Sequence, residues 1–231
     1  VACELGRDLA TALEAVEHPR VTVLRGDFVD MTASTLSAAL TSVTDSYVRL
    51  RAVGNLPYNV GTAMIGTLAK LHRAGLPFVD ATVMLQREVA DRLVAAPGTR
   101  DYGALTVLSG QWAVADRLFV VPPGAFRPAP SVQSAVVRLR YRTSAISDPT
   151  TPPSLPLDQG HFETLVKLLF GQRRKTLTKA LRNISESQQL DVDAVLARTA
   201  IDGRRRPDTL TPDELMRLAN ATAPETPRSP F

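Results

Sequence analysis

Residues Asn55, Leu56, Pro57 and Tyr58 bring an amide, a main-chain carbonyl and an aromatic ring into one short segment. They follow an apolar run at residues 47–53 that has the pattern of a buried strand. Open α/β sheets bind ligands at the carboxyl ends of their strands, so the segment would lie at a binding edge. The Asn55 Oδ1 atom and a main-chain carbonyl can accept both hydrogens of an amino group while Tyr58 covers the attached ring. We expect a site for a flat, amino-bearing ring here, although an ordinary strand-to-helix turn uses the same residue types.

Three further segments resemble motifs that occur in this order in one known family. Residues 126–134 have the pattern Phe-x-Pro-x-Pro-x-Val-x-Ser, residues 172–177 read Gln-Arg-Arg-Lys-Thr-Leu, and residues 210–215 read Leu-Thr-Pro-Asp-Glu-Leu. Together with Gly54-Asn55-Leu56-Pro57-Tyr58, they resemble the ribosomal RNA adenine-N6,N6 dimethyltransferases of the small subunit. The matching segments extend from residue 1 to residue 221, and four ordered motifs are far more specific than any one of them.

The resemblance implies a function and a catalytic site. Members of the family transfer methyl groups from S-adenosylmethionine to N6 of two adjacent adenosines in a hairpin of small-subunit ribosomal RNA, during ribosome biogenesis. The resemblance assigns the catalytic site to Asn55, Leu56, Pro57, Tyr58 and Phe126. The target base would leave its stack, and Tyr58 and Phe126 would hold it from its two faces.

The cofactor half of the site would use the ends of two strands. A nucleoside cofactor needs a carboxylate for its ribose hydroxyls, and Glu4 ends the first strand of the chain. Asp27 follows the next strand and would accept from the adenine amino group, while Leu5 and Phe28 would flank the adenine and Asn55 would border the cofactor. Each carboxylate also has a purely local interpretation: Glu4 would interact with the start of the next helix, and Asp27 would form an Asx-turn.

One family motif is missing. The glycine-rich loop that follows the family's first strand has no counterpart, because no Gly-x-Gly-x-Gly occurs in the 231 residues and Val1 begins what reads as the second strand. The first strand is central in a doubly wound sheet, so its loss would open the core and remove half of the cofactor cradle. We expect either an amino-terminal truncation or a natural remnant that binds the cofactor poorly.

Composition bounds the remaining possibilities. A hydrophobic content of 44% can fill a core, and no apolar run approaches the length of a membrane span. The single cysteine, Cys3, excludes an internal disulfide and fits a reducing compartment, while the three histidines are scattered, which argues against zinc. There is no signal peptide pattern. We expect a cytoplasmic monomer without a metal and without membrane attachment.

Positive charge is concentrated in one segment. The chain has a net charge of +4, and residues 164–185 contain six cations and no acid. Such a stripe can neutralise several phosphates, so we predict RNA binding by these six residues, whereas a solvated helix face is the alternative. The cations are Lys167, Arg173, Arg174, Lys175, Lys179 and Arg182.

The order of elements predicts the architecture. Strands are expected at residues 1–4, 21–24, 47–53, 81–85, 112–121 and 134–141, with helices at 7–16, 36–40, 62–71, 86–95 and 104–111. This alternation indicates an α/β fold with a doubly wound, Rossmann-like methyltransferase sheet over residues 1–143, whose first strand is missing. A Ser/Thr/Pro-rich linker at 144–157, a small all-helical RNA-binding domain at 158–222 and a flexible tail at 223–231 complete the expected organisation.

Other functions compete with this interpretation. A noncatalytic ribosome-assembly or transcription factor would keep the fold and the basic helices; the absent glycine loop favours it and the intact Asn55–Tyr58 segment opposes it. A relative acting on large-subunit RNA more often has Ile where this chain has Leu56. A DNA adenine methyltransferase usually has Asn-Pro-Pro-Tyr and a target-recognition domain, and neither is seen here.

Overall fold

The computed structural model describes residues 1–16, 18–41, 49–142, 156–185 and 190–223. The chain forms two compact units, of which the first comprises Val1–Ala90 and Ala113–Thr143 and the second Asp91–Trp112 and Ser144–Phe231. The expected linker at 144–157 and the expected tail at 223–231 fall almost entirely outside the described residues.

The first unit alternates strands and helices, as the sequence predicts. Two short 3-10 helices, η1 (Phe28–Asp30) and η2 (Pro123–Ala125), lie between its regular elements. The regular elements are β1 (Ala2–Glu4), α1 (Arg7–Ala15), β2 (Val23–Arg25), α2 (Ala33–Thr41), β3 (Leu50–Asn55), α3 (Gly61–Arg73), β4 (Phe78–Gln86), α4 (Arg87–Leu93, which continues past the end of this unit's first segment), β5 (Ala113–Val121) and β6 (Ser134–Tyr141).

The strands form two sheets. Strands β1 and β2 pair in parallel as a two-stranded sheet, and the other four strands form a mixed sheet in the order β3-β4-β6-β5. In the mixed sheet β3 pairs in parallel with β4, while β6 runs antiparallel to both β4 and β5. The α/β class is therefore confirmed, and among the described residues β1 and β3 share no ladder.

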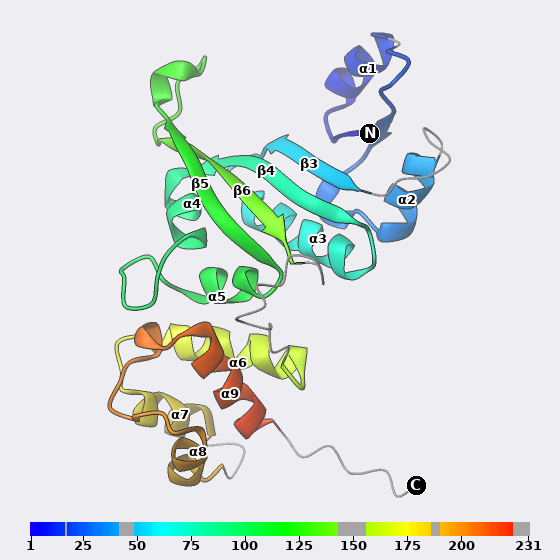
Figure 1. Ribbon diagram of the computed structural model, residues 1–231. Coiled ribbons are helices and arrows are strands. Elements are labelled where there is room, and N and C mark those ends of the chain that lie inside the picture. The colour runs from blue at the N-terminus through cyan, green and yellow to red at the C-terminus, as the bar shows by residue number, and fades with distance from the viewer. Residues whose placement is uncertain (17, 42–48, 143–155, 186–189, 224–231) are drawn as a thin grey trace, which may run out of the picture. The chain divides into compact units, whose positions relative to one another are not determined.

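The core of the first unit lies against the four-stranded sheet. The inward side chains of β4 and β6, which include Ala81, Val83, Val137 and Leu139, are almost completely buried. Helices α3 and α4 lie on the same face of this sheet (Figure 1), and Ile65 and Leu68 of α3 are buried. This packing holds β3 and β4 in register, so that Asn55 is paired with Met84 at the carboxyl end of the sheet.

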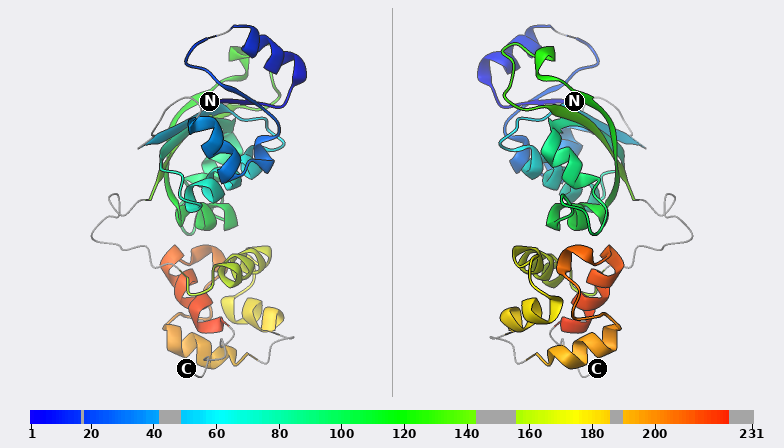
Figure 2. Two further views of the ribbon diagram at one scale, coloured as in Figure 1. Left: turned by 90° about the vertical axis from the view of Figure 1, so that its right-hand side faces the viewer. Right: turned by 90° about the vertical axis from the view of Figure 1, so that its left-hand side faces the viewer.

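The second unit is entirely helical among its described residues (Figure 2). Its elements are α5 (Ala104–Gly110), α6 (Gln159–Gly171), α7 (Leu177–Ser185), α8 (Val192–Thr199), η3 (Pro207–Thr209) and α9 (Pro212–Thr222). The apolar positions that predict α6, namely Phe162, Leu165, Val166 and Leu169, are all buried in one cluster. The cluster also includes Tyr102 and Val107, so residues that precede the expected linker belong to the helical core.

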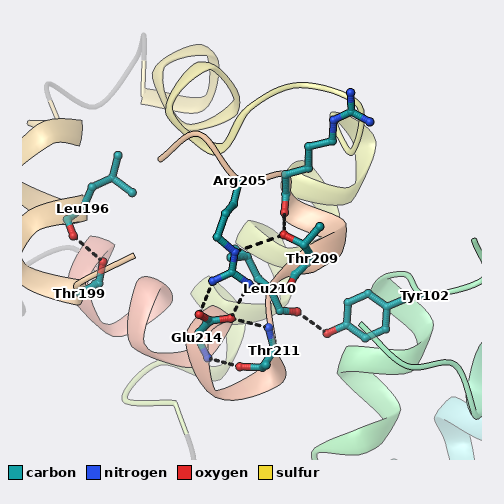
Figure 3. A network of polar contacts seen from close by, with 9 residues as sticks. Tyr102, Leu196, Thr199, Arg205, Thr209, Leu210, Thr211 and Glu214 are labelled. Carbon is teal, nitrogen blue, oxygen red and sulfur yellow. Dashed lines mark hydrogen bonds and ion pairs between the residues drawn. The ribbon is translucent and has the colours of Figure 1, made fainter. Parts of the chain in front are cut away.

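A polar network closes this helical core near the start of α9 (Figure 3). The Thr211 side chain accepts from Glu214 N at 3.2 Å, and the Glu214 carboxylate accepts in return from Thr211 N at 2.8 Å. Arg205 donates to both oxygens of the same carboxylate, at 2.5 and 3.1 Å. Thr211 and Glu214 therefore form a capping box, which is reinforced by the ion pair between Arg205 and Glu214.

Candidate functional site

Asn55 and Leu56 point in opposite directions at the end of β3. The Leu56 side chain is buried, and its main-chain N–H donates to the Met84 carbonyl at 3.1 Å. Asn55 is exposed and, within the described ranges, its amide hydrogen-bonds no other residue. Pro57 follows and ends the ladder, because it has no N–H to donate. The strand therefore presents a free side-chain amide at the sheet edge while the next residue anchors the backbone.

A cavity of about 400 Å³ lies between β1 and β3. Its volume is within the range of roughly 300–1,000 Å³ that is usual for small-molecule sites. Of the predicted site residues, it is lined by Phe28, Asn55 and Leu56. Cys3 lines it as well, and burial raises the pKa of its thiol, which stays neutral. The lining is mostly apolar and Asn55 brings an amide to it, which suits a flat heterocycle.

Glu4 and Asp27 make the local contacts that their positions allow. The Glu4 Oε1 atom accepts from Gly6 N at 2.7 Å, and the Asp27 Oδ1 atom accepts from Val29 N at 2.8 Å. Each contact uses one carboxylate oxygen and leaves the second for a ligand. Leu5 is 67% exposed. These three residues lie at the ends of β1 and β2 and do not line the cavity, unlike Phe28.

Tyr58 is connected to the segment that carries Phe126. The Tyr58 and Ser134 hydroxyls share a hydrogen bond of 2.6 Å, and Ser134 is the first residue of β6. Phe126 is half-buried and directly follows η2 in the connection between β5 and β6. The sequence did not single out Ser134 as a site residue, although it is the final serine of the Phe-x-Pro-x-Pro-x-Val-x-Ser pattern.

Two of the six predicted RNA-binding cations have acidic partners from other segments. Arg173 lies 3.4 Å from the Asp208 carboxylate and also donates to the Arg100 carbonyl at 3.0 Å. Arg182 lies 3.1 Å from the Asp193 carboxylate. The expectation that this stretch lacks acidic partners is therefore wrong for these two residues, because folding brings acids that are distant in the sequence.

The other four cations, Lys167, Arg174, Lys175 and Lys179, are exposed, and no acid pairs with them in the part of the chain that the structure describes. A second basic run, residues 204–206, lies beside the start of α7. Leu177 N donates to the Arg205 carbonyl at 2.7 Å, and Thr178 N donates to the Gly203 carbonyl at 3.0 Å. A Cβ atom at residue 203 would lie 2.2 Å from the Thr178 hydroxyl oxygen, so any larger residue there would force Thr178 to move.

Exposed Arg206 therefore lies on a loop that is bonded to the same helix start as Arg174 and Lys175. We call Arg174, Lys175 and Arg206 the basic surface. Arg206 is a residue that the sequence reasoning missed, and the signal that points to it is the Arg204-Arg205-Arg206 run itself. In this run Arg204 pairs with Asp202 and Arg205 with Glu214.

Among the described residues, no helix is both long and apolar enough to cross a membrane, and no group of three His, Cys, Asp or Glu side chains is placed to hold a metal ion.

Comparisons with known proteins agree on one family. The family model described as ribosomal RNA adenine dimethylase matches residues 1–223. Proteins named ribosomal RNA small subunit methyltransferase A from Chromohalobacter salexigens and Alcanivorax borkumensis are each 38% identical to this chain. The matches cover 97% and 96% of this chain and 73% and 71% of those relatives.

Two solved structures share the fold. A dimethyladenosine transferase from Plasmodium falciparum matches with a TM-score of 0.66 at 18% identity, over 94% of this chain and 78% of that chain. The 23S rRNA methyltransferase ErmE matches with a TM-score of 0.58 at 22% identity, over 95% of this chain and 80% of that chain.

Proposed function

The chain belongs to the ribosomal RNA adenine dimethylase family, and from that membership we propose that it transfers methyl groups from S-adenosylmethionine to N6 of adenines in ribosomal RNA. The two adjacent adenosines of a small-subunit hairpin are the proposed targets, with the assembling 30S subunit as the partner and the cytoplasm as the location. The observation that carries the proposal is the exposed Asn55 amide at the mouth of an apolar cavity.

Asn55 and Leu56 address the difficulty of methylating N6, whose lone pair is delocalised into the adenine ring. The Asn55 Oδ1 atom and the Leu56 carbonyl would accept the two N6 hydrogens, which favours a more tetrahedral nitrogen. The same oxygens would stabilise the positive charge that develops during transfer. Preorganised contacts of this kind contribute about 3 kcal/mol each. A strong base is not required, because the N6 proton becomes acidic after transfer and leaves to water.

Two aromatic rings would offset the cost of extruding the base. Unstacking costs a few kcal/mol, and each contact between a base and an aromatic ring returns about 1–3 kcal/mol. Tyr58 lies on the loop after β3, and Phe126 lies on the loop before β6. A purine held between these rings would present N6 to Asn55 in line with the methyl donor, and orientation of this kind lowers the barrier further.

The cofactor would be held by Phe28, which lines the cavity, and by Glu4 and Asp27, which lie outside it. Phe28 offers a ring for the adenine of the cofactor, and the second oxygens of Glu4 and Asp27 would accept from its ribose hydroxyls and its amino group. When bound, S-adenosylmethionine supplies an already electrophilic methyl group. The remaining task of the chain is therefore to hold N6 in place and exclude competing nucleophiles.

The helical unit would hold the RNA backbone. Lys167, Lys179 and the basic surface offer exposed charges that are not paired with acids among the described residues. Arg173 and Arg182, which are ion-paired, would contribute less unless RNA displaces their partners. Phosphate contacts position a substrate without selecting its sequence, so site choice depends on the RNA shape around the two adenosines.

The proposal is tested by incubating the chain with S-adenosylmethionine and small-subunit particles that lack the modification. Mass spectrometry of the digested RNA should then show N6,N6-dimethyladenosine. A control with large-subunit RNA should remain unmodified, and modification of that RNA instead would reassign the substrate. Calorimetry with S-adenosylmethionine separates the enzyme from the noncatalytic assembly factor. RNA binding without any heat from the cofactor would support the factor.

A further inference from the structure

Ser134 is a buried hydroxyl group at a junction in the sheet. The residue is 0% exposed, and it pairs with Gln86 of β4 on one side and with Val121 of β5 on the other. Next to it, the main-chain N–H of Arg87 donates to the Gln133 carbonyl at 2.9 Å. The Ser134 backbone is thus fixed on both sides, and its side chain is anchored to a rigid part of the molecule.

The Tyr58 side chain, in contrast, lies on the loop after β3 and is only half-buried. A tyrosine on such a loop can rotate about both of its side-chain torsions. The 2.6 Å hydrogen bond to Ser134 joins the far end of the ring to β6, across 76 residues of sequence. A bond at the para oxygen restricts χ1, because rotation about χ1 would carry that oxygen away from Ser134, whereas rotation about χ2 turns the ring about the axis that passes through the oxygen.

We propose that Ser134 is a positioning residue, which holds the ring of Tyr58 at the place where it stacks on the target adenine. This inference rests on the proposed function of Tyr58 and adds the group that orients it. Ser134 does not touch the base. The hydrogen bond restricts the motion of the Tyr58 side chain before RNA binds, so that less conformational entropy is lost when the base is extruded. Because β6 begins at Ser134, the same bond also couples Tyr58 to the loop that carries Phe126.

A double-mutant cycle tests the inference. Tyr58→Phe keeps the ring and removes its hydroxyl, while Ser134→Ala removes the other partner. We expect kcat for methyl transfer to fall roughly fivefold in each variant, as expected for loss of one neutral hydrogen bond, with KM unchanged. The double variant should be no worse than either single variant, because both remove the same interaction. Ser109→Ala is the matched control, since Ser109 is a buried serine of the helical unit whose hydroxyl donates to the Thr106 carbonyl at 3.3 Å.

Two further readouts do not depend on methyl transfer. With fluorotyrosine incorporated, the Tyr58 fluorine resonance should shift and sharpen in Ser134→Ala and stay in place in Ser109→Ala. The fluorescence of 2-aminopurine, placed at a target position of an RNA hairpin, should be quenched less by Ser134→Ala and by Tyr58→Phe than by the unsubstituted chain. Both variants should bind the hairpin with unchanged affinity. If Ser134→Ala fails to fold, Tyr58→Phe alone carries the test through kcat and quenching.

Additive losses in the cycle, an unchanged Tyr58 resonance, or equal losses in Ser109→Ala would each overturn the inference. Failure of the proposed function is a different result: the unsubstituted chain would then transfer no methyl group to RNA. In that case the fluorine resonance and the 2-aminopurine quenching still decide whether Ser134 orients the ring.

Discussion

The Tyr102 hydroxyl donates a 2.8 Å hydrogen bond to the Leu210 carbonyl, 108 residues further along the chain (Figure 3). The tyrosine is almost completely buried, and burial raises the pKa of its hydroxyl well above the ordinary value. The bond ties the segment before α5 to the loop before α9. The helical unit therefore depends on residues 91–112 as well as on the carboxyl-terminal part of the chain.

Tyr102→Phe should destabilise the helical unit by about 1–3 kcal/mol, because the Leu210 carbonyl would be left buried without its donor. Urea unfolding followed by circular dichroism measures the change. A fragment that starts at residue 156 should lose helical structure for the same reason, since it lacks Tyr102 and Val107. A fragment that unfolds cooperatively with the stability of the whole unit would contradict this account.

The Glu214 carboxylate makes the helical unit sensitive to acid. Hydrogen bonds from Arg205 lower the pKa of Glu214 below its ordinary value, and the Thr211 N–H adds to the effect. A lowered pKa in the folded state gives stability that is fully present above the ordinary glutamate pKa of about 4.3. This stability is lost as pH falls through the folded value.

Glu214→Gln should therefore be less stable than the unsubstituted chain at pH 7, and the difference should shrink steadily below about pH 4.3. Thermal melts at a series of pH values measure it. Arg205→Ala removes the other partner of the ion pair, so its difference in stability from the unsubstituted chain should also shrink as the pH falls. A stability difference that is independent of pH would show that the ion pair is not its source.

Replacing both Arg174 and Lys175 by alanine should weaken RNA binding and lower its salt dependence. Each lost phosphate contact reduces the slope of log K against log salt by about 0.7–0.9. Filter binding at several salt concentrations gives this slope. Arg182→Ala is the matched control, because Arg182 is paired with Asp193 and should change the slope less. Equal changes in the slope for the two variants would indicate that RNA contacts Arg182 as well as Arg174 and Lys175.

Gly203→Ala tests the contact that brings the second basic run beside α7. A Cβ atom at residue 203 would lie 2.2 Å from the Thr178 hydroxyl oxygen and 2.7 Å from a Leu196 methyl group. We expect a destabilisation of about 1–3 kcal/mol from overpacking. Gly171→Ala should be neutral or slightly stabilising, since open space surrounds that position. Similar melting temperatures for the two variants would show that the close approach at residue 203 is absent in solution.

Local patterns in the sequence predict most of the elements of this fold. The period of Phe162, Leu165, Val166 and Leu169 predicts α6, and the alternation of Val137, Leu139 and Tyr141 with polar residues predicts β6, because one buried face imposes these periods. The exposure of Asn55 beside buried Leu56 follows from the same alternation.

Relationships between distant segments are not visible in such patterns. The acidic partners of Arg173 and Arg182 come from segments that only folding brings near. The Tyr58–Ser134 bond and the place of Tyr102 in the helical core are of the same kind. The period of apolar residues shows which face of a helix or strand is buried, but it does not show which element packs against that face.

The most direct test is methyl transfer by Asn55→Ala, with Asn59→Ala, on the loop that follows β3, as the matched control. Mass spectrometry should detect no N6-methylated adenosine with Asn55→Ala, while its RNA affinity stays at the unsubstituted level and Asn59→Ala remains active. Continued dimethylation by Asn55→Ala would show that the amide at the end of β3 does not hold the target nitrogen, and the proposed mechanism would be wrong.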